Sequence, residues 1–482
     1  MKIVLLFPSW TGEYGIFSHF AKKASIWPPL NLAYLAAIAE REGHLVRIID
    51  GEAERLSLKK TIEEVALFAP DIIGITATTP FYHLAVQLAR ALKGADKSVP
   101  IIIGGHHITV LKENGFVDPF DYAFIGEAEI SWPEFLRRLE EKKDISDVKG
   151  ILFRDGKKII STGPQDKTED IDAIPFPARH LLKMDRYLIG TMRGRKNFTT
   201  IMTTRGCPFK CVFCSTDVFG SKVRRRDARS VIDEIKSVIL DYNIRHFIFL
   251  DDTLTLDRKY MLEICDIIEK EKLSITFEGS TRANLVDDEL ILRLSRAGLI
   301  RLSFGLETVD AEIRRLIKKE VPLECYATAN RITNKYKIET LNSVMLGLPG
   351  ETRETVGKTL AFLKNAREIH QANFSIATPY PGTELYSMAK NGEHGLRLIT
   401  EDFSKYRRYG SAVMAVHDLT PEDLIELQND GFVSIYSAPW RIMPMIRKSG
   451  FLGGMLTMSR IFKGIWKKSF RKKHKAALSG KD

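Results

Sequence analysis

The segment Thr203–Cys214 reads Thr-Thr-Arg-Gly-Cys-Pro-Phe-Lys-Cys-Val-Phe-Cys and places three of the five cysteines within eight residues. Thiolates at this spacing can surround one metal centre, and soft sulfur ligands select zinc or iron–sulfur clusters. Structural zinc needs a fourth ligand, but no second Cys or His pair follows at zinc-finger spacing. The triplet Cys207, Cys211 and Cys214 therefore predicts a four-iron cluster with one iron open to a small molecule.

Three unrelated buried cysteines are the simpler alternative, and the tight spacing disfavours it. The remaining cysteines, Cys265 and Cys325, stand singly in helical patterns. A lone cysteine of this kind is typical of a protein core, so we expect neither to bind metal.

The triplet follows the first strand of an alternating strand–helix series. The apolar runs expected to form its strands are Thr200–Thr203, His246–Leu250, Ile275–Glu278, Arg301–Gly305, Ser343–Leu346 and Asn373–Ala377. Helical patterns such as Ala228–Asp241 and Arg258–Glu271 lie between them. Six such units indicate a partial or full (β/α) barrel, whose functional groups belong at the carboxyl ends of the strands.

A separate α/β series precedes the barrel. Its expected strands are Ile3–Phe7, Val46–Ile49, Ile72–Thr76, Ile101–Ile103 and Tyr122–Ile125, with helical patterns such as Leu30–Glu42 and Thr61–Phe68. Near-continuous apolar strands separated by helices are typical of a parallel sheet covered on both faces. We expect a doubly wound, Rossmann-like domain that binds ligands at the carboxyl ends of its strands.

Small and polar residues follow three of these strands. The segments are Thr76-Ala77-Thr78-Thr79-Pro80, Gly104-Gly105-His106-His107 and Gly126-Glu127-Ala128-Glu129. In any single loop such residues can merely form a tight turn, but three loops together favour a site for a large flat or nucleotide-like ligand. The first strand is not followed by GxGxxG, so the usual dinucleotide fingerprint is missing.

These patterns divide the chain into four parts. We expect an N-terminal domain over residues 1–147, a linker with a small hairpin over 148–195, the barrel over 196–400, and a helical C-terminal region with a basic amphipathic tail over 401–482. The segment Ile174-Pro175-Phe176-Pro177 is typical of a linker.

The cysteine motif resembles the radical S-adenosylmethionine (SAM) superfamily, in which C-x3-C-x2-C follows the first barrel strand and an aromatic residue precedes the last cysteine. The resemblance implies that Cys207, Cys211 and Cys214 ligate a [4Fe-4S] cluster. The open iron of such a cluster chelates SAM, and an electron from the cluster cleaves SAM to a 5′-deoxyadenosyl radical. By position in the barrel, the resemblance implies that the residues binding SAM are Phe213, Asp251, Ser280, Arg282, Glu307, Gly347 and Pro349. A surface role for Glu307 or Arg282 is the alternative.

The N-terminal domain resembles that of the cobalamin-binding subclass of this superfamily. The resemblance covers roughly residues 1–400 and implies a cobalamin site made by the three strand ends. The implied residues are Thr76, Thr78, Thr79, Pro80, Gly104, Gly105, His107, Gly126, Glu127 and Glu129. The cobalamin signature D-x-H-x-x-G is absent, so we expect base-off cobalamin without a histidine ligand. We also expect Trp27–Asn31 to close over the corrin ring.

The resemblance implies an enzyme that methylates an unactivated carbon of a small or lipid-like substrate and receives electrons from a donor such as ferredoxin or flavodoxin. Radical ring closure or rearrangement without methyl transfer is an open alternative, and the catalytic residues that would decide between them are not identified. Methylthiolation is disfavoured because no cysteine precedes Cys207. A non-catalytic cobalamin sensor or carrier is the alternative of another class.

Composition and cysteine content limit the class of protein and its expected cellular compartment. The 482 residues are 44% hydrophobic and 28% charged, which excludes a disordered or collagen-like chain. Five cysteines in a chain of this length indicate a reducing cytosol, and the apolar run that Pro8 ends is expected to be a strand, not a signal peptide. No run of 18 apolar residues is present, so we expect no membrane span.

The net charge of +11 is confined to the C-terminus. Residues 441–482 contain 12 Lys/Arg and one acidic residue, while the other 440 residues are balanced. Within 456–468, Ile461, Phe462, Ile465 and Trp466 fall near one helical face. We expect this tail to attach peripherally to an anionic membrane surface. A helix packed on the barrel is one alternative, and a nucleic-acid contact is a weaker one.

Overall fold

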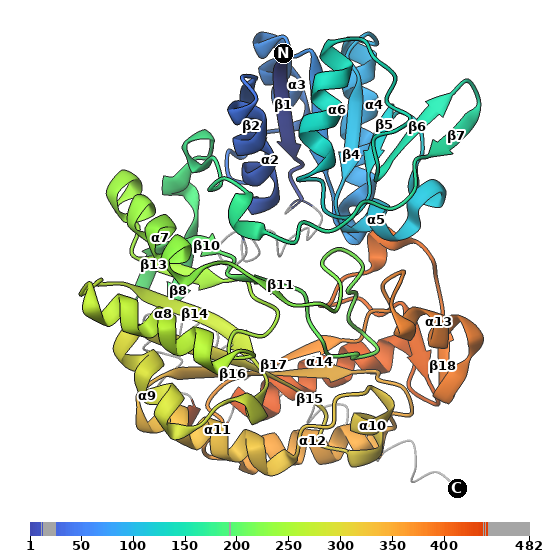
Figure 1. The fold of residues 1–482 in the computed structure, drawn as a ribbon. Helices are drawn as coiled ribbons and strands as arrows, with labels where there is room; N and C mark the ends of the chain where they lie inside the picture. Colours follow the sequence, from blue (N-terminus) through green and yellow to red (C-terminus); the bar gives the residue numbers. More distant parts are fainter. Residues whose placement is uncertain (11, 13–25, 192–193, 437, 439, 442–482) are drawn as a thin grey trace, which may run out of the picture.

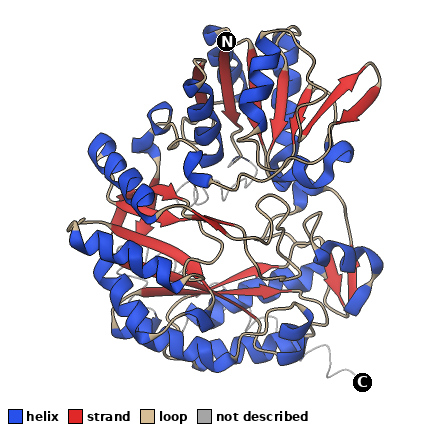
Figure 2. Cartoon of the chain, viewed as in Figure 1, coloured by secondary structure: helices blue, strands red, loops and turns tan. Residues whose placement is uncertain are grey.

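The computed structural model describes every residue except 11, 13–25, 192–193, 437, 439 and 442–482 (Figure 1). Two α/β units account for most of the described chain, and Figure 2 shows that helices flank the strands in both. This architecture confirms the fold class predicted from the sequence. Within the described residues, no helix is both long enough and apolar enough to cross a membrane. The predicted basic tail lies outside the described residues from residue 442 onward.

The N-terminal unit contains a seven-stranded sheet in the order β2-β1-β3-β4-β5-β6-β7. Its parallel strands are β1 (Lys2–Phe7), β2 (Leu45–Asp50), β3 (Ile72–Thr76), β4 (Ile101–Gly104) and β5 (Tyr122–Phe124). All five strands predicted for this domain are therefore present. The chain order reverses between β1 and β3, and a crevice for ligands opens at such a switch point.

Alternating side chains of β1 explain why both sheet faces are covered. Ile3 and Leu5 pack on one face, and Val4 and Leu6 pack on the other. The helices of this unit are α2 (Leu30–Arg41), α3 (Leu58–Phe68), α4 (Tyr82–Ala95), α5 (His106–Leu111) and α6 (Ser131–Glu140). The face that carries Ile3 is continuous with the core of the second unit, so the two units share one hydrophobic core.

The hairpin predicted in the linker belongs to the first sheet. Its strands β6 (Ile151–Asp155) and β7 (Lys158–Ser161) extend the sheet antiparallel to β5. The chain after it is also partly structured, because β8 (Leu188–Thr191) pairs with β9 (Gly194–Asn197). Strands β6 and β7, which were expected to lie in a linker, therefore belong to the first sheet, because β6 hydrogen-bonds to the edge of β5 and β7 to β6.

The second unit is an open, six-stranded parallel sheet in the order β10-β13-β14-β15-β16-β17. Its strands are β10 (Thr199–Ile201), β13 (His246–Phe249), β14 (Thr276–Thr281), β15 (Leu299–Glu307), β16 (Glu339–Leu346) and β17 (Ala372–Ile376). Its helices are α7 (Ala228–Tyr242), α8 (Arg258–Lys270), α9 (Asp288–Ala297), α10 (Ala311–Leu316), α11 (Leu323–Lys335), α12 (Arg353–Asn365) and α13 (Glu384–Asn391). The prediction of a partial barrel is confirmed.

The C-terminal region contains a hairpin and a helix. Strands β18 (Leu396–Leu398) and β19 (Met414–Val416) pair antiparallel, and α14 (Pro421–Tyr436) packs along β17. Arg441 is only 2% exposed. Its Nη2 atom donates to the backbone carbonyls of Leu363, Ala366 and Ile369 over 2.6–2.9 Å. Arg441, which we counted in the basic tail, is therefore part of the folded barrel.

Candidate functional site

The three predicted cluster ligands lie in one loop that a small hairpin closes. Strand β11 (Thr204–Arg205) precedes the loop, and β12 (Arg224–Arg225) follows it and pairs antiparallel with β11. Gly206 has φ +98°, and a Cβ atom there would meet the carbonyl oxygen of Lys222 at 2.3 Å. Glycine is therefore required where the chain turns into Cys207.

Backbone hydrogen bonds attach the loop to the barrel helices. Val212 donates its N–H to the carbonyl of Ile317 at the end of α10 over 3.2 Å, and Leu385 in α13 donates to the carbonyl of Val212 over 2.8 Å. Cys214 donates its N–H to the carbonyl of Cys211 over 3.0 Å. The cysteines are thus presented by a loop with defined backbone contacts.

The surroundings of Cys211 favour its thiolate. A hydrogen bond from the Cys214 thiol lowers the pKa of Cys211, and the charges of Lys319 and Arg282 act in the same direction. Thiolate is the form of cysteine that binds metal. Within the described part of the chain, no three His, Cys, Asp or Glu side chains converge on a point suited to one metal ion. Three thiolates can bind a multi-iron cluster in which three iron atoms each take one cysteine ligand.

Glu307, Lys319 and Phe213 form one cluster beside the cysteine loop. Glu307 ends β15 with φ +60°, a conformation that non-glycine residues seldom adopt. Lys319 Nζ donates to its Oε1 over 2.8 Å and lies 5.8 Å from the centroid of the Phe213 ring. Arg282, at the end of β14, stacks 3.8 Å from the ring centroid of Phe209. Three residues predicted to bind SAM, Phe213, Arg282 and Glu307, therefore lie beside the cysteine loop.

The remaining residues predicted to bind SAM differ in exposure. Ser280 is exposed in β14, and Pro349 is buried just after β16. Gly347 has φ +85° and donates its N–H to Glu351 Oε2 over 2.5 Å. Burial raises the pKa of Glu351 to about 8. The turn after β16 is thus held by a buried carboxyl group that the sequence analysis did not single out.

Asp251, also predicted to bind SAM, holds the chain that enters the cysteine loop. Its Oδ1 atom accepts from the backbone N–H of Thr203 over 3.0 Å and from the hydroxyls of Thr203 and Thr204 over 2.9 and 2.7 Å. It also accepts from the backbone N–H of Thr204. Its other oxygen, Oδ2, is buried without a protein partner among the described residues. The hydrogen bonds of Oδ1 therefore hold the loop, while Oδ2 can accept a hydrogen bond from a polar ligand.

A cavity of about 450 Å³ opens between the two units. Seven of the ten residues predicted to bind cobalamin line it: Thr76, Thr78, Gly104, Gly105, Gly126, Glu127 and Glu129. The walls are largely apolar, and the predicted cover Trp27–Asn31 contributes to them. The barrel supplies Thr200, Met202, Arg205 and Leu250. This volume is within the range of small-molecule sites, and the site touches both units.

Three predicted residues are absent from the cavity wall: Thr79, Pro80 and His107. His107 packs between Tyr82 and Phe403, with ring centroids 4.1 and 5.3 Å away. His107 was predicted to contact cobalamin, but it lies outside the cavity wall. The helix turn that begins at His106 directs the side chains of the two histidines apart. His106 lines the cavity instead, and no pattern in the sequence separated the two neighbours.

Four charged side chains connect the two units beside the cavity. Glu127 is 5% exposed and accepts from Arg205 Nη1 over 2.8 Å and from Arg224 Nη1 over 3.0 Å. Glu129 pairs with Arg205 Nη2 over 2.7 Å. Two carboxylates thus balance two guanidinium groups. Glu127 and Glu129, predicted to bind cobalamin, also bind the strands that flank the cysteine loop.

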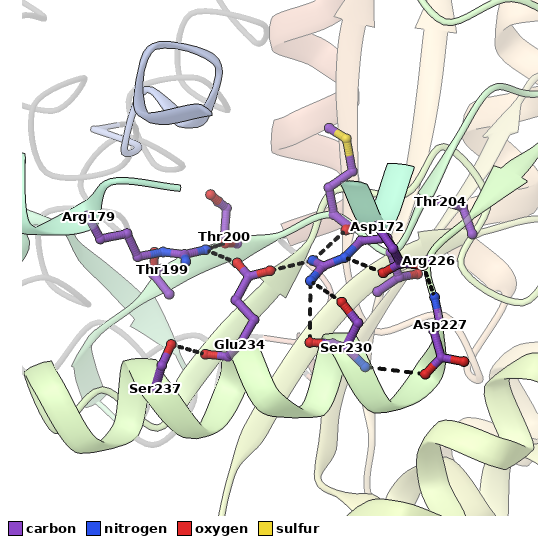
Figure 3. A network of polar contacts seen from close by, with 12 residues as sticks. Asp172, Arg179, Thr199, Thr200, Thr204, Arg226, Asp227, Ser230, Glu234 and Ser237 are labelled. Carbon is purple, nitrogen blue, oxygen red and sulfur yellow. Dashed lines mark hydrogen bonds and ion pairs between the residues drawn. The ribbon is translucent and has the colours of Figure 1, made fainter. Parts of the chain in front are cut away.

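A second buried network connects the chain before the barrel to the barrel's first strand and helix (Figure 3). Arg179 donates to Thr200 O over 2.7 Å and to Glu234 Oε1 over 2.6 Å. The other oxygen of Glu234 accepts from Arg226, which follows β12. Asp172 accepts from the backbone N–H of Asp227 over 2.6 Å. The network fixes β10 and the chain just after β12, which lie before and after the cysteine loop in the sequence.

Two family models match the chain. The model of the radical SAM superfamily matches residues 201–363, and that of the B12 binding domain matches residues 20–136. An uncharacterized methyltransferase of Pyrococcus horikoshii is 34% identical over 86% of this chain and 88% of its own. The anaerobic magnesium-protoporphyrin IX monomethyl ester cyclase of Rubrivivax gelatinosus is 30% identical over 84% of this chain and 72% of its own.

A solved structure has the same fold at low sequence identity. It is the radical S-adenosylmethionine methyltransferase TsrM from Kitasatospora setae, with cobalamin and a [4Fe-4S] cluster bound. The TM-score is 0.70 at 17% identity, over 91% of this chain and 88% of that chain. The likeness extends over both α/β units.

The neighbouring residues Asp251 and Asp252 provide a matched test of the loop anchor. Asp251→Ala leaves two backbone N–H groups without their acceptor, so we expect a loss of about 2–4 kcal/mol and an unfolding midpoint lower by about 2–4 °C. Asp252 is exposed, so Asp252→Ala should change stability by less than about 0.5 kcal/mol. Thermal unfolding followed by circular dichroism measures both. Equal shifts in the two variants would contradict the anchoring role.

Proposed function

Because this chain belongs to the radical SAM superfamily and carries a B12 binding domain, we propose that it methylates an unactivated carbon of a small or lipid-like substrate in a cobalamin-dependent radical reaction. The resemblance drawn from the cysteine spacing is confirmed. The observation that carries the proposal is the position of the cavity, whose wall includes both the strand ends of the B12 binding domain and Arg205, two residues before Cys207.

The residues of the loop and of the neighbouring strand ends fit a [4Fe-4S] cluster and SAM. The donor set is three thiols, and Lys319 and Arg282 offset the negative charge of such a cluster. Arg282 Nε and Asp251 Oδ2 are buried polar atoms without protein partners among the described residues. We propose that these two atoms, with Glu307 and the turn at Gly347, hold the polar groups of SAM. Phe213 would lie beside the adenine.

The cavity fits a large flat ligand. Cβ atoms added at Gly104 and Gly126 would meet nothing within 4 Å, so both glycines face open space. Asn31 Nδ2 donates to Thr76 Oγ1 over 2.9 Å and fixes one side of the opening. We propose that cobalamin binds here in the base-off form, without a histidine ligand to cobalt.

When bound, the cofactors would supply a radical that removes a hydrogen atom from the substrate and a methyl group for the resulting carbon radical. The chain's own part is to orient both cofactors and to exclude water. The apolar wall at Trp27, Pro28 and Trp132 excludes water from the cavity. Electrons would come from a donor such as ferredoxin or flavodoxin, and we propose no nucleic-acid substrate.

Ring closure is the second candidate, and the 30% identity to a cyclase favours it specifically. It uses the same radical step but transfers no methyl group. A sensor or carrier that binds cobalamin without catalysis would need no cluster, so the intact cysteine triplet argues against it.

Anaerobic assays and metabolite profiling test the reaction. We expect about four iron and four sulfide per chain, and 5′-deoxyadenosine from SAM under reducing conditions. Replacement of Cys207, Cys211 and Cys214 by Ala should abolish both, whereas Cys325→Ala should change neither. In a deletion strain, a lost metabolite or lipid and an accumulated one that differ by one methyl group support methylation. A difference of two hydrogens at constant carbon number supports ring closure and overturns our first choice.

Gly104→Leu tests the cobalamin site without changing a polar group. The leucine side chain would project into the cavity, so we expect the Kd for hydroxocobalamin to rise by about tenfold or more. The control is Gly357→Leu in α12, where an added Cβ also meets nothing within 4 Å. Equilibrium dialysis with absorption spectra measures binding. A histidine-ligated spectrum that His106→Ala or His107→Ala removes would contradict the base-off proposal.

We also propose that the basic tail attaches the protein to an anionic membrane surface. Each Lys or Arg near such a surface contributes about 1 kcal/mol. A chain ending after Arg441 is the proper comparison with the full chain, because the bonds of Arg441 to the barrel are kept. We expect the full chain to co-sediment with phosphatidylserine vesicles at low salt and the shortened chain to stay in solution. Equal binding, or none by either, would contradict attachment through the tail.

A further inference from the structure

Both ends of the cysteine loop meet at one carboxylate of the other unit. Arg205 lies at the start of the loop in β11, and Arg224 lies at its end in β12. Each donates to Glu127 from the loop between β5 and α6, Arg205 through Nη1 and Arg224 through both Nη atoms. Glu127 therefore closes the loop as a bridge between its two ends.

The bridge is shielded from solvent. The side chains of Glu127, Arg205 and Arg224 are 2–4% exposed. The Arg205 guanidinium also lies 5.6 Å from the ring centroid of Tyr34 in α2 and 5.2 Å from that of Phe219 in the loop. Buried ion pairs are screened little by salt, and loss of one partner leaves the others uncompensated.

Apart from this bridge, little regular secondary structure holds the two ends of the loop together. Strands β11 and β12 contribute two residue pairs, Thr204 with Arg225 and Arg205 with Arg224. An isolated two-stranded hairpin is marginally stable even when longer. The Cys207 N–H donates to the carbonyl of Gly220 over 3.2 Å, so the first cysteine depends on the same closure.

We infer that Glu127 is a positioning residue through which the B12 binding domain sets the conformation of the cysteine loop. Because Glu127 and Arg205 also line the cavity, a ligand there stabilises the closed loop. Coupling of this kind is reciprocal, so a closed loop also favours binding in the cavity. The ligand part rests on the proposed function, whereas the bridge itself does not.

Hydrogen exchange of the full, cluster-free chain tests the bridge. In Glu127→Gln the side chain keeps its size but loses the charge that faces two arginines. We expect amides within 204–225 to exchange about tenfold faster or more, because their local opening becomes more favourable. Amides of α2 and α6 should be unchanged. The iron content after anaerobic reconstitution should fall in parallel.

Glu169→Gln is the matched control. Glu169 also pairs with the loop, through Lys222 over 2.6 Å, but both side chains are about 70% exposed (71% and 67%). Exposed pairs contribute little, so exchange within 204–225 should change by less than about twofold. If Glu127→Gln does not fold, Arg224→Gln replaces it, because it removes one end of the same bridge. Equal effects of the bridge and control variants, or faster exchange throughout both units, would overturn the inference.

Hydroxocobalamin provides the second measurement. Added to the cluster-free wild type, it should slow exchange within 204–225, and it should have a smaller effect in Glu127→Gln. If it binds without slowing exchange there, the coupling is wrong although the cobalamin site stands. If it does not bind at all, the proposed function fails, while the comparison of Glu127→Gln with Glu169→Gln still tests the bridge.

Discussion

The pairing of Glu127 with Arg205 and Arg224 crosses the boundary between the two units of the fold. A parallel sheet and an open barrel each place their ligand-binding edge at the carboxyl ends of their strands. Ligands bound at the two edges can act on one substrate only if the edges face each other at a fixed distance. The charge cluster beside the cavity joins the β5–α6 loop to both ends of the cysteine loop. The shared hydrophobic core then supports this junction over a wider area.

Buried charge has a cost that hydrophobic contact does not, because each ion loses its hydration. The protein offsets that cost twice in the same region. Two glutamates meet two arginines at the cavity, and Glu234 meets Arg179 and Arg226 behind the first barrel strand. Pairing of this kind requires defined geometry. The network at Glu127 joins the two units, and the network at Glu234 joins the chain before the barrel to the barrel.

The sequence predicted the elements better than the connections between them. Periodicity located the five parallel strands of the first sheet and the six of the barrel, because each forms from its own local pattern. Side-chain partners depend on approaches between distant segments, which no local pattern encodes. The two acids of Gly126–Glu129 were therefore predicted as cofactor contacts, and their arginine partners were missed. His106 and His107 show the same limit, since the start of a helix decides which of two adjacent histidines reaches the cavity.

The position of Arg441 has a consequence for any tethered form of the protein. Its guanidinium binds carbonyls at the end of α12 and just before β17, which is the amino end of the barrel strands. The last described residue therefore lies at the end of the barrel strands opposite the one that carries the cysteine loop. A molecule held directly after Arg441 would therefore turn its cavity away from its point of attachment. A lipid-like substrate would have to leave the bilayer before it reached the cavity, unless the tether is long enough for the molecule to roll over.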